Sequence, residues 1–364
     1  MPLKTVNGDH GSAHKGRGAT LNPEGRFETS RREAFDDGWS FAPGEGPGRP
    51  RTVVTAETVK GIISRNSSPD IPFTFSINPY RGCEHGCIYC YARPSHAYLG
   101  LSPGLDFETR LFAKVNAAQK LREELAKPSW ACATISIGAN TDPYQPAERE
   151  WRITRSILEV AAGCNQPVVI ITKNALVERD IDLLAPMAGK DLLRVFVSVT
   201  TLDHDLARRM EPRASAPARR VQAIRRLSEA GIPVGVMVAP IVPLLTDAET
   251  EKILEAAADA GAQSAGYVLA RLPWEVKDLF RDWLRHHYPL KADHVMSRVR
   301  QMRDGKENDP EFGSRMRGSG EFADLLRMRF GKACARLGLD GHRRPLDTSK
   351  FVRPRLDGQR DLFG

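Results

Sequence analysis

Short apolar runs rich in β-branched residues alternate with stretches of helical period through the middle of this chain, and this alternation limits the fold more than any other feature. The apolar runs lie at 73–77, 132–137, 167–172, 194–199, 233–238 and 265–270. The stretches of helical period lie at 112–126, 151–162, 178–188, 216–230 and 247–260. Buried strands that alternate with amphipathic helices are typical of a parallel sheet with helical crossovers. The repeats are too few for the eight units of a closed barrel, so we predict an α/β fold whose sheet is either a partial barrel or an open, wound sheet.

The same pattern sets the predicted boundaries. Residues 1–71 are rich in Gly, Pro, Ser and charged residues, so we predict an N-terminal arm that is largely irregular. The alternating pattern defines a core over 72–272. Helical periodicity without strand runs continues over 273–345, and 346–364 has no such periodicity, so we predict a helical C-terminal extension and then an extended tail.

Positive charge gathers towards the C-terminus. The formal net charge is +8 at pH 7, and nearly all of this surplus falls within residues 271–364. A basic region is typical of proteins that bind a polyanion such as nucleic acid. An ordinary solvated surface with no specific partner can carry the same excess of positive charge. No apolar run approaches the ~20 residues of a membrane span, and the N-terminus lacks the apolar core of a signal peptide. We therefore expect a cytoplasmic protein without a membrane partner.

Three of the six cysteines lie together after the first predicted strand. Cys83, Cys87 and Cys90 have the spacing C-x3-C-x2-C. A structural zinc site needs four ligands, and His85 is the candidate for the fourth, although so short a loop would have difficulty surrounding one ion. A [4Fe–4S] cluster accepts three cysteines and leaves one iron open. The spacing therefore favours an iron–sulfur cluster, and a zinc-stabilised nucleic-acid-binding protein without catalytic activity is the alternative.

Polar residues follow the other predicted strands at the point where each strand ends. They are Thr141 with Asp142, Lys173, Ser198, Ala239 and Arg271. At Ala239 the polar group is the backbone, because alanine has no polar side chain. The carboxyl ends of parallel strands meet at one edge of a sheet or barrel, and sites form there. We therefore expect these residues and the three cysteines to surround one site.

The cysteine loop, with Tyr89 directly before its last cysteine, resembles the signature of the radical S-adenosylmethionine superfamily. Within it, the chain is most similar to the branch of spore photoproduct lyase and the DNA repair photolyase-like proteins. The resemblance covers about residues 72–272 and implies a partial (β/α)6 TIM-like barrel, a [4Fe–4S] cluster and S-adenosylmethionine as cofactors. It implies an enzyme that cleaves S-adenosylmethionine reductively to a 5′-deoxyadenosyl radical. For this branch, a nucleic acid or nucleotide substrate and an electron donor of flavodoxin or ferredoxin type are expected.

The resemblance also assigns cofactor contacts. Tyr89 and Tyr91 are expected to pack by the cluster and the adenine of S-adenosylmethionine. Thr141 and Asp142 match a Ser/Thr-Asp pair near the methionyl end, although Thr-Asp before Pro is also a common turn. Lys173 resembles a lysine that pairs with the methionyl carboxylate, and otherwise it is a surface lysine at a strand end.

Further contacts are implied at the later strands. Ser198 resembles a serine near the ribose or the methionyl group, and it could instead be a packed hydroxyl. Ala239 matches a backbone position beside the adenine. Glu211 and Gln145 are lesser candidates for contacts to the ribose or the amino group.

One loop departs from the pattern of spore photoproduct lyase. That enzyme has a hydrogen-donating cysteine just before the Ser/Thr-Asp pair, whereas residues 138–140 read Gly-Ala-Asn here. The resemblance therefore implies cofactor cleavage without implying reversal of thymine dimers. Tyr144 and Tyr267 are the residues that we consider as a substitute radical relay.

The last residues resemble a short docking peptide. Gln359, Leu362 and Phe363 fit the Q-x-[SD]-L-F pattern with which bacterial proteins bind the replication sliding clamp. The two apolar side chains would fill a pocket and the glutamine would bond at its rim. The alternative is a tail that packs on its own domain.

Overall fold

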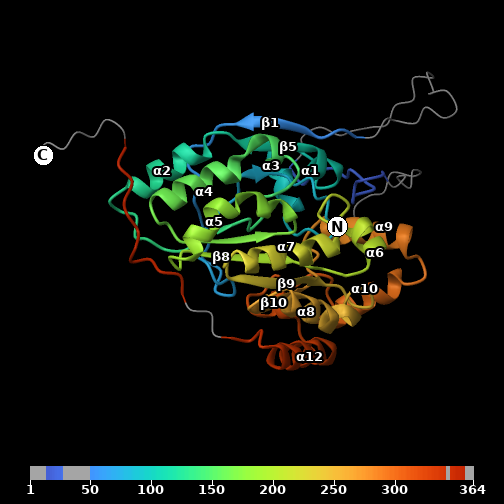
Figure 1. The fold of residues 1–364 in the computed structure, drawn as a ribbon. Helices are drawn as coiled ribbons and strands as arrows, with labels where there is room; N and C mark the ends of the chain where they lie inside the picture. The colour runs from blue at the N-terminus through green and yellow to red at the C-terminus, as the bar shows by residue number, and fades with distance from the viewer. Residues whose placement is uncertain (1–13, 28–49, 342–344, 357–364) are drawn as a thin grey trace, which may run out of the picture.

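The centre of the molecule is a seven-stranded sheet in the order β10-β9-β8-β7-β6-β3-β2 (Figure 1). This computed structural model describes residues 14–27, 50–341 and 345–356. Within the sheet, β2 (Ser64–Arg65) pairs antiparallel with β3, and every other pairing is parallel. The parallel strands are β3 (Phe75–Ile77), β6 (Ile135–Ile137), β7 (Val168–Thr172), β8 (Leu193–Ser198), β9 (Val234–Ile241) and β10 (Ser264–Leu269). Each of them overlaps its predicted apolar run, and the fold is the predicted partial (β/α)6 TIM-like barrel.

Helices between the strands cover the outside of this sheet. The longer ones are α2 (Ala117–Ala126), α4 (Ile153–Gly163), α5 (Ile181–Ala188), α7 (Pro217–Glu229) and α8 (Thr250–Asp259). The shorter ones are η1 (Arg93–Leu99), α1 (Leu105–Thr109), α3 (Glu148–Trp151), η2 (Ala175–Asp180), α6 (His204–Met210) and η3 (Asp247–Glu249). In the described ranges, no helix combines the length and the hydropathy that crossing a membrane requires.

The strands appear as unbroken apolar runs because they are buried on both faces. In β8, Val195 and Val197 are fully buried and Phe196, which points to the opposite face, is only 6% exposed. A parallel sheet has this composition because crossover helices or packed side chains cover both of its faces. The run pattern of the sequence therefore predicted these strands directly.

A second sheet of three strands was not predicted. It has the order β1-β5-β4 and consists of β1 (Val53–Glu57), β4 (Tyr80–Arg81) and β5 (Arg110–Lys114). The prediction of a helix from residue 112 was wrong at its start, because residues up to Lys114 belong to β5. Its partner β1 lies within the segment predicted to be largely irregular, and the two strands pair in parallel from Val53 with Arg110 onwards. Local periodicity carries no information about so distant a pairing.

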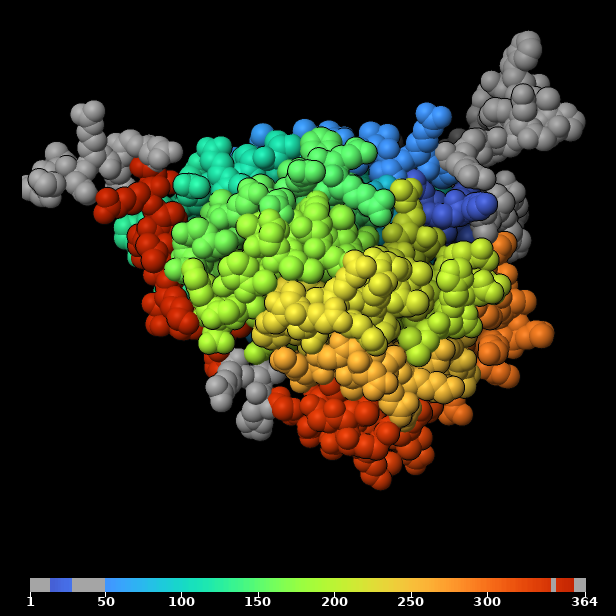
Figure 2. Space-filling model, in the orientation of Figure 1, coloured from blue at the N-terminus to red at the C-terminus, as the bar shows by residue number. Residues whose placement is uncertain are grey.

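The C-terminal extension packs on the outside of the barrel. It contains α9 (Val276–His287), α10 (Ala292–Gln301), α11 (Ser314–Arg317) and α12 (Glu321–Leu337). Residues 345–356 form neither helix nor strand and follow one edge of the molecule, shown in red at the left of Figure 2. They bind loops that precede the strands, since Val352 N donates to Cys164 O at 2.9 Å. The three residues of the docking peptide lie outside the described part of the chain.

Candidate cofactor site

A cavity of about 240 Å³ opens at the carboxyl ends of the parallel strands. The cysteine loop forms one wall of the cavity through Cys83, Cys87 and Cys90. The loops and ends of five further strands supply the rest, through Asp142, Lys173, Ser198, Ala239 and Arg271 among others. The structure thus brings the three cysteines and the predicted strand-end residues together, with Thr141 as the exception.

Backbone hydrogen bonds hold the cysteine loop against the barrel. Cys83 N donates to Phe107 O at 2.9 Å, and Ile88 N donates to Met210 O at 3.0 Å. Gly82 adopts a φ of 76°, and a Cβ there would lie 2.9 Å from Phe107 O, so this turn requires glycine. The first cysteine therefore leaves β4 in a fixed direction.

Gln145 also positions this loop. Its Oε1 accepts from Glu84 N at 2.8 Å, and its Nε2 donates to Gly82 O at 3.2 Å. The side chain is fully buried and does not line the cavity. Both of its polar groups are therefore engaged with the loop backbone, and not turned towards the ribose or amino group of a cofactor.

A buried ion pair, which the sequence analysis missed, lies behind the cysteines. Arg93 Nη2 lies 2.5 Å from Glu108 Oε1, and both side chains are completely buried. The same guanidinium donates to Cys87 O at 2.9 Å and to Gly86 O at 3.1 Å. The guanidinium group therefore fixes the backbone at the second cysteine and at the residue before it.

The N-terminal segment covers the outer side of this ion pair. Gly18 N and Ala19 N donate to the Glu108 carboxylate at 3.0 and 2.8 Å, and Arg17 Nη1 donates to Glu108 O at 3.0 Å. A Cβ on Gly18 would collide with the carbonyl oxygen of Gly86 in the cysteine loop. Part of the arm therefore packs on the body, directly on the cysteine loop.

The thiols suit a cluster better than a single ion. Burial raises the pKa of the Cys83, Cys87 and Cys90 thiols, so a bound cation is needed to stabilise their thiolate forms. Among the described residues, no three His, Cys, Asp or Glu side chains are arranged to hold one metal ion. Thiolates that bind three different irons of a [4Fe–4S] cube do not have to converge on one point. The residues present therefore fit the cluster, and they do not fit tetrahedral zinc.

His85 is already engaged by other residues, so it is a poor fourth zinc ligand. Asn174 Oδ1 accepts from Leu176 N at 3.0 Å and from Ser215 Oγ at 3.1 Å. Asn174 Nδ2 is therefore the donor to His85 Nε2, at 3.1 Å. The proton of the neutral ring is left on Nδ1, which lies 3.4 Å from Asp142 Oδ2. Burial lowers the pKa of His85 to about 4, which is consistent with a neutral ring.

Asp142 joins three loops at the rim of the cavity. Its Oδ1 accepts from Thr172 Oγ1 at 2.7 Å, and its Oδ2 accepts from Lys173 N at 2.6 Å. Thr141 is buried and donates its hydroxyl to Tyr80 O at 3.0 Å, away from the cavity. Of the Thr-Asp pair, only the aspartate lines the cavity.

Lys173 places its ammonium group inside the cavity wall. Its Nζ donates to Ala239 O at 2.9 Å and lies 3.6 Å from Glu211 Oε1. Burial lowers the pKa of Lys173 to about 8. Arg220 already pairs with the buried carboxylate of Glu211, which Thr200 Oγ1 also bonds at 2.7 Å. Glu211 thus lies close to the lysine ammonium group without lining the cavity itself.

The tyrosines flanking the last cysteine lie at different depths. Tyr89 is buried, and its hydroxyl donates to Glu211. Tyr91 is 46% exposed, and its hydroxyl donates to Ala139 O across the cavity mouth. Ser198, the last residue of β8, also lines the cavity and is 5% exposed.

Neither proposed relay tyrosine lines the cavity. Tyr144 is fully buried in the main hydrophobic core. Tyr267 is also in this core, and its ring lies 4.6 Å from the ring of Phe330 on α12. The geometry gives neither hydroxyl direct access to a molecule bound beside the cysteines.

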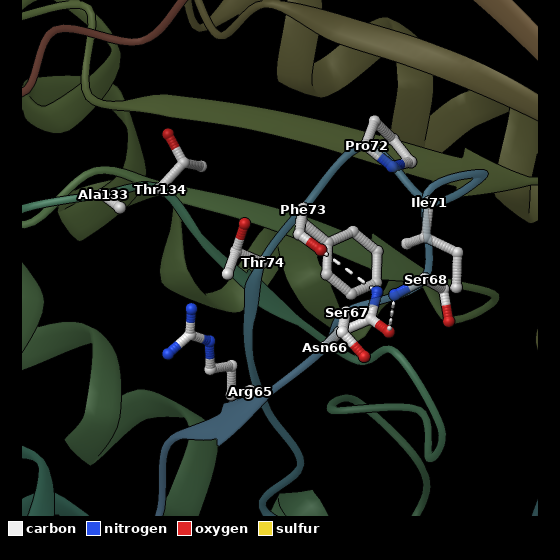
Figure 3. A pocket seen from close by; sticks show the side chains of 10 residues that line it. All are labelled: Arg65, Asn66, Ser67, Ser68, Ile71, Pro72, Phe73, Thr74, Ala133 and Thr134. Carbon is white, nitrogen blue, oxygen red and sulfur yellow. Dashed lines mark hydrogen bonds between the residues drawn. The ribbon is translucent and has the colours of Figure 1, made fainter.

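A second pocket lies at the opposite end of the barrel (Figure 3). Its lining residues come from 65–74 and 133–134, which precede β3 and β6. Asn66 organises the loop, because its Nδ2 donates to Phe73 O at 3.2 Å and its Oδ1 accepts from Ser68 N at 3.0 Å. The pocket contains none of the cysteines or strand-end residues, so we do not assign the cofactors to it.

Comparison with known proteins identifies the family of this chain. The profile of the Radical SAM superfamily matches residues 77–257. An uncharacterized protein of Mycobacterium tuberculosis is 36% identical over 278 residues, which are 76% of this chain and 78% of that protein. An uncharacterized protein of Acidianus two-tailed virus is 31% identical over 187 residues, which are 50% of this chain and 60% of that protein. The chain belongs to the radical SAM superfamily and is a radical SAM enzyme, with a [4Fe–4S] cluster and S-adenosylmethionine as its cofactors.

Solved structures of spore photoproduct lyase have the same fold. One matches with a TM-score of 0.57 at 16% identity, over 78% of this chain and 79% of that chain. Another, with bound AdoMet and dinucleoside spore photoproduct, matches with a TM-score of 0.55 at 15% identity over the same shares. At this level of identity the likeness concerns the fold, and the roles of individual residues are argued below.

Proposed function

We propose that this enzyme binds a [4Fe–4S] cluster through Cys83, Cys87 and Cys90 and cleaves S-adenosylmethionine reductively, and that it acts on a nucleic acid or nucleotide. Cys83, Cys87 and Cys90 would hold the cluster, which would supply the one electron needed to cleave the C5′–S bond of S-adenosylmethionine to methionine and a 5′-deoxyadenosyl radical, the species that would take a hydrogen atom from the substrate. The main support is that the three thiols share one cavity with side chains from the ends of five further strands.

The chain's own residues bind and orient the cofactor. The ammonium group of Lys173 suits the methionyl carboxylate, because it lines the cavity and no carboxylate of the described residues lies closer to it than 3.6 Å. Asp142 orients this lysine's backbone and the ring of His85. We assign the Ser198 side chain and the backbone at Ala239, whose carbonyl oxygen also accepts from Lys173 Nζ, to the ribose and the adenine.

The surroundings limit access of water to the reaction. Tyr91 reaches across the mouth to the loop after β6, and Tyr89 packs beneath it. Most of the cavity's lining is apolar, with Ile171, Met237 and Val268 on the strands. Such a site keeps a reactive radical away from solvent.

Two observations support a nucleic acid or nucleotide as the substrate. The fold is that of spore photoproduct lyase, one structure of which is a complex with a dinucleoside spore photoproduct. In addition, nearly all of the net charge of +8 falls within residues 271–364. We further propose a cytoplasmic location and an electron donor of flavodoxin or ferredoxin type.

Anaerobic reconstitution with iron and sulfide, followed by dithionite and S-adenosylmethionine, tests the proposal. We expect 5′-deoxyadenosine from the wild type and none from Cys87→Ala, which lacks one of three cluster ligands. Cys164→Ala is the matched control, because that buried thiol directly follows the C-terminus of α4 and does not line the cavity. If the wild-type protein binds zinc but no iron and forms no 5′-deoxyadenosine, the result would favour the alternative of a non-catalytic nucleic-acid-binding protein.

A further inference from the structure

One arginine in the cavity wall, Arg271, has no role in the proposed binding of the cofactors. Arg271 follows β10 and lines the cavity together with Cys90 and Tyr91. Its guanidinium carbon lies 5.6 Å from the ring centroid of Tyr91, and its Nη1 lies 3.5 Å from Met316 Sδ. Its Nε is buried without a hydrogen-bond partner. Within the described residues, no carboxylate forms an ion pair with it.

A segment of the C-terminal extension, residues 309–319, bridges the two edges of the partial barrel, and we call it the seam segment. Arg315 forms a bidentate ion pair with Asp70, at 2.6 and 2.7 Å, in the loop between β2 and β3. Arg303 is buried and donates to Arg315 O at 2.7 Å and to Ala270 O, after β10, at 2.8 Å. Because β2 and β10 are the edge strands of the sheet, these bonds hold the segment across its opening.

The seam segment brings cationic and aromatic groups to the wall that contains Arg271. Arg317 is exposed and directly follows the methionine that contacts Arg271. Its guanidinium carbon lies 4.4 Å from the ring centroid of Tyr267, and it forms no ion pair within the described ranges. Phe312 is 57% exposed, and the guanidinium of Arg315 lies 4.6 Å from its ring centroid. Since Arg315 is neutralised by its aspartate, the charge available to a ligand comes from Arg271 and Arg317.

We propose that this wall binds a phosphodiester group of a nucleic acid substrate, with Arg271 and Arg317 as its ligands and Phe312 as a surface on which a base stacks. A guanidinium group matches the geometry of phosphate oxygens, and an exposed aromatic ring stacks on bases of any sequence. Because Arg271 lines the same cavity as the cysteines, a strand held here lies next to the cofactor site. The inference rests on the proposed function and names how the substrate is held.

The test is binding of a fluorescein-labelled single-stranded DNA oligonucleotide to the full-length, anaerobically reconstituted protein, measured by anisotropy over a series of salt concentrations. We expect Arg271→Gln and Arg317→Gln each to weaken binding about 10-fold or more, because each removes a charge-assisted contact to phosphate. Each should also reduce the slope of log affinity against log salt by about 1. Arg336→Gln on α12, an exposed arginine paired with Glu255 at 2.6 Å, is the matched control and should bind as the wild type does.

Three results would overturn the inference. They are wild-type protein that does not bind the oligonucleotide, both variants binding it as tightly as the wild type, or the control losing as much affinity as the variants. If Arg271→Gln does not fold, Arg317→Gln decides alone, because this side chain is exposed. Formation of 5′-deoxyadenosine by the wild type is scored separately, so that failure of this inference is distinguished from failure of the proposed function.

Discussion

Replacing Glu108 by glutamine tests how the cysteine loop is held. The carboxylate is completely buried, lies 2.5 Å from Arg93, and accepts from Gly18 N and Ala19 N. Removing one partner of a buried ion pair leaves an uncompensated charge, which costs about 3–5 kcal/mol. The remaining hydrogen bonds of Arg93 go to carbonyl oxygens, which have no net charge, so they do not compensate the positive charge of the guanidinium group. We expect the free energy of unfolding of the apo protein to fall by about 3–5 kcal/mol.

Urea unfolding under reducing, anaerobic conditions measures this change, and trypsin cleavage after Arg17 gives a second readout. The Glu108→Gln variant should be cleaved faster at that bond, because Gly18 and Ala19 lose their anionic acceptor. Glu123→Gln is the control, since Glu123 is a solvated carboxylate paired with Lys120 at 2.7 Å, and its unfolding should not change. A fall of less than about 1 kcal/mol with unchanged cleavage would refute the reasoning.

Three further predictions concern the cofactor, the loop and the tail. Lys173→Met should weaken binding of S-adenosylmethionine, measured by equilibrium dialysis, about 10-fold or more, since it removes the positive charge proposed for the carboxylate; unchanged affinity would remove that role. Gly86→Ala should speed the loss of iron to a chelator, because this residue has a φ of 67° and a Cβ there would lie 2.7 Å from Glu108 Oε2; the same change at Gly163, which has open space around it, should not. If the tail docks on the sliding clamp, replacing both Leu362 and Phe363 by alanine should abolish capture of the chain by purified clamp, and equal capture would exclude that docking.

The barrel strands were predictable because each lies in an apolar run that is buried or half-buried on both faces. The same property made the site predictable, since residues that follow parallel strands meet at one end. The pairing of β1 with β5 was not predictable, because no local pattern links residues so far apart, and the last residues of β5, from Phe112, have a composition that also suits a helix.

The contacts behind the cysteine loop were missed for a similar reason. Arg93 and Glu108 are ordinary charged residues in the sequence, and only the fold shows that they pair in the interior. The relation between Gly18 and Gly86 is likewise a close approach of two distant segments. Gln145 was expected as a lesser candidate for a contact to the ribose or the amino group, but its partners are the loop backbone.

The most direct test of the account is electron paramagnetic resonance of the dithionite-reduced, reconstituted protein, recorded with and without S-adenosylmethionine and alongside iron analysis. The account predicts about four irons per chain and a cluster signal that changes when S-adenosylmethionine is added, because three cysteines leave one iron open to it. Cys83→Ala, Cys87→Ala and Cys90→Ala should each lose the signal. A wild-type signal that S-adenosylmethionine leaves unchanged, or a protein that binds zinc in place of iron, would contradict the account.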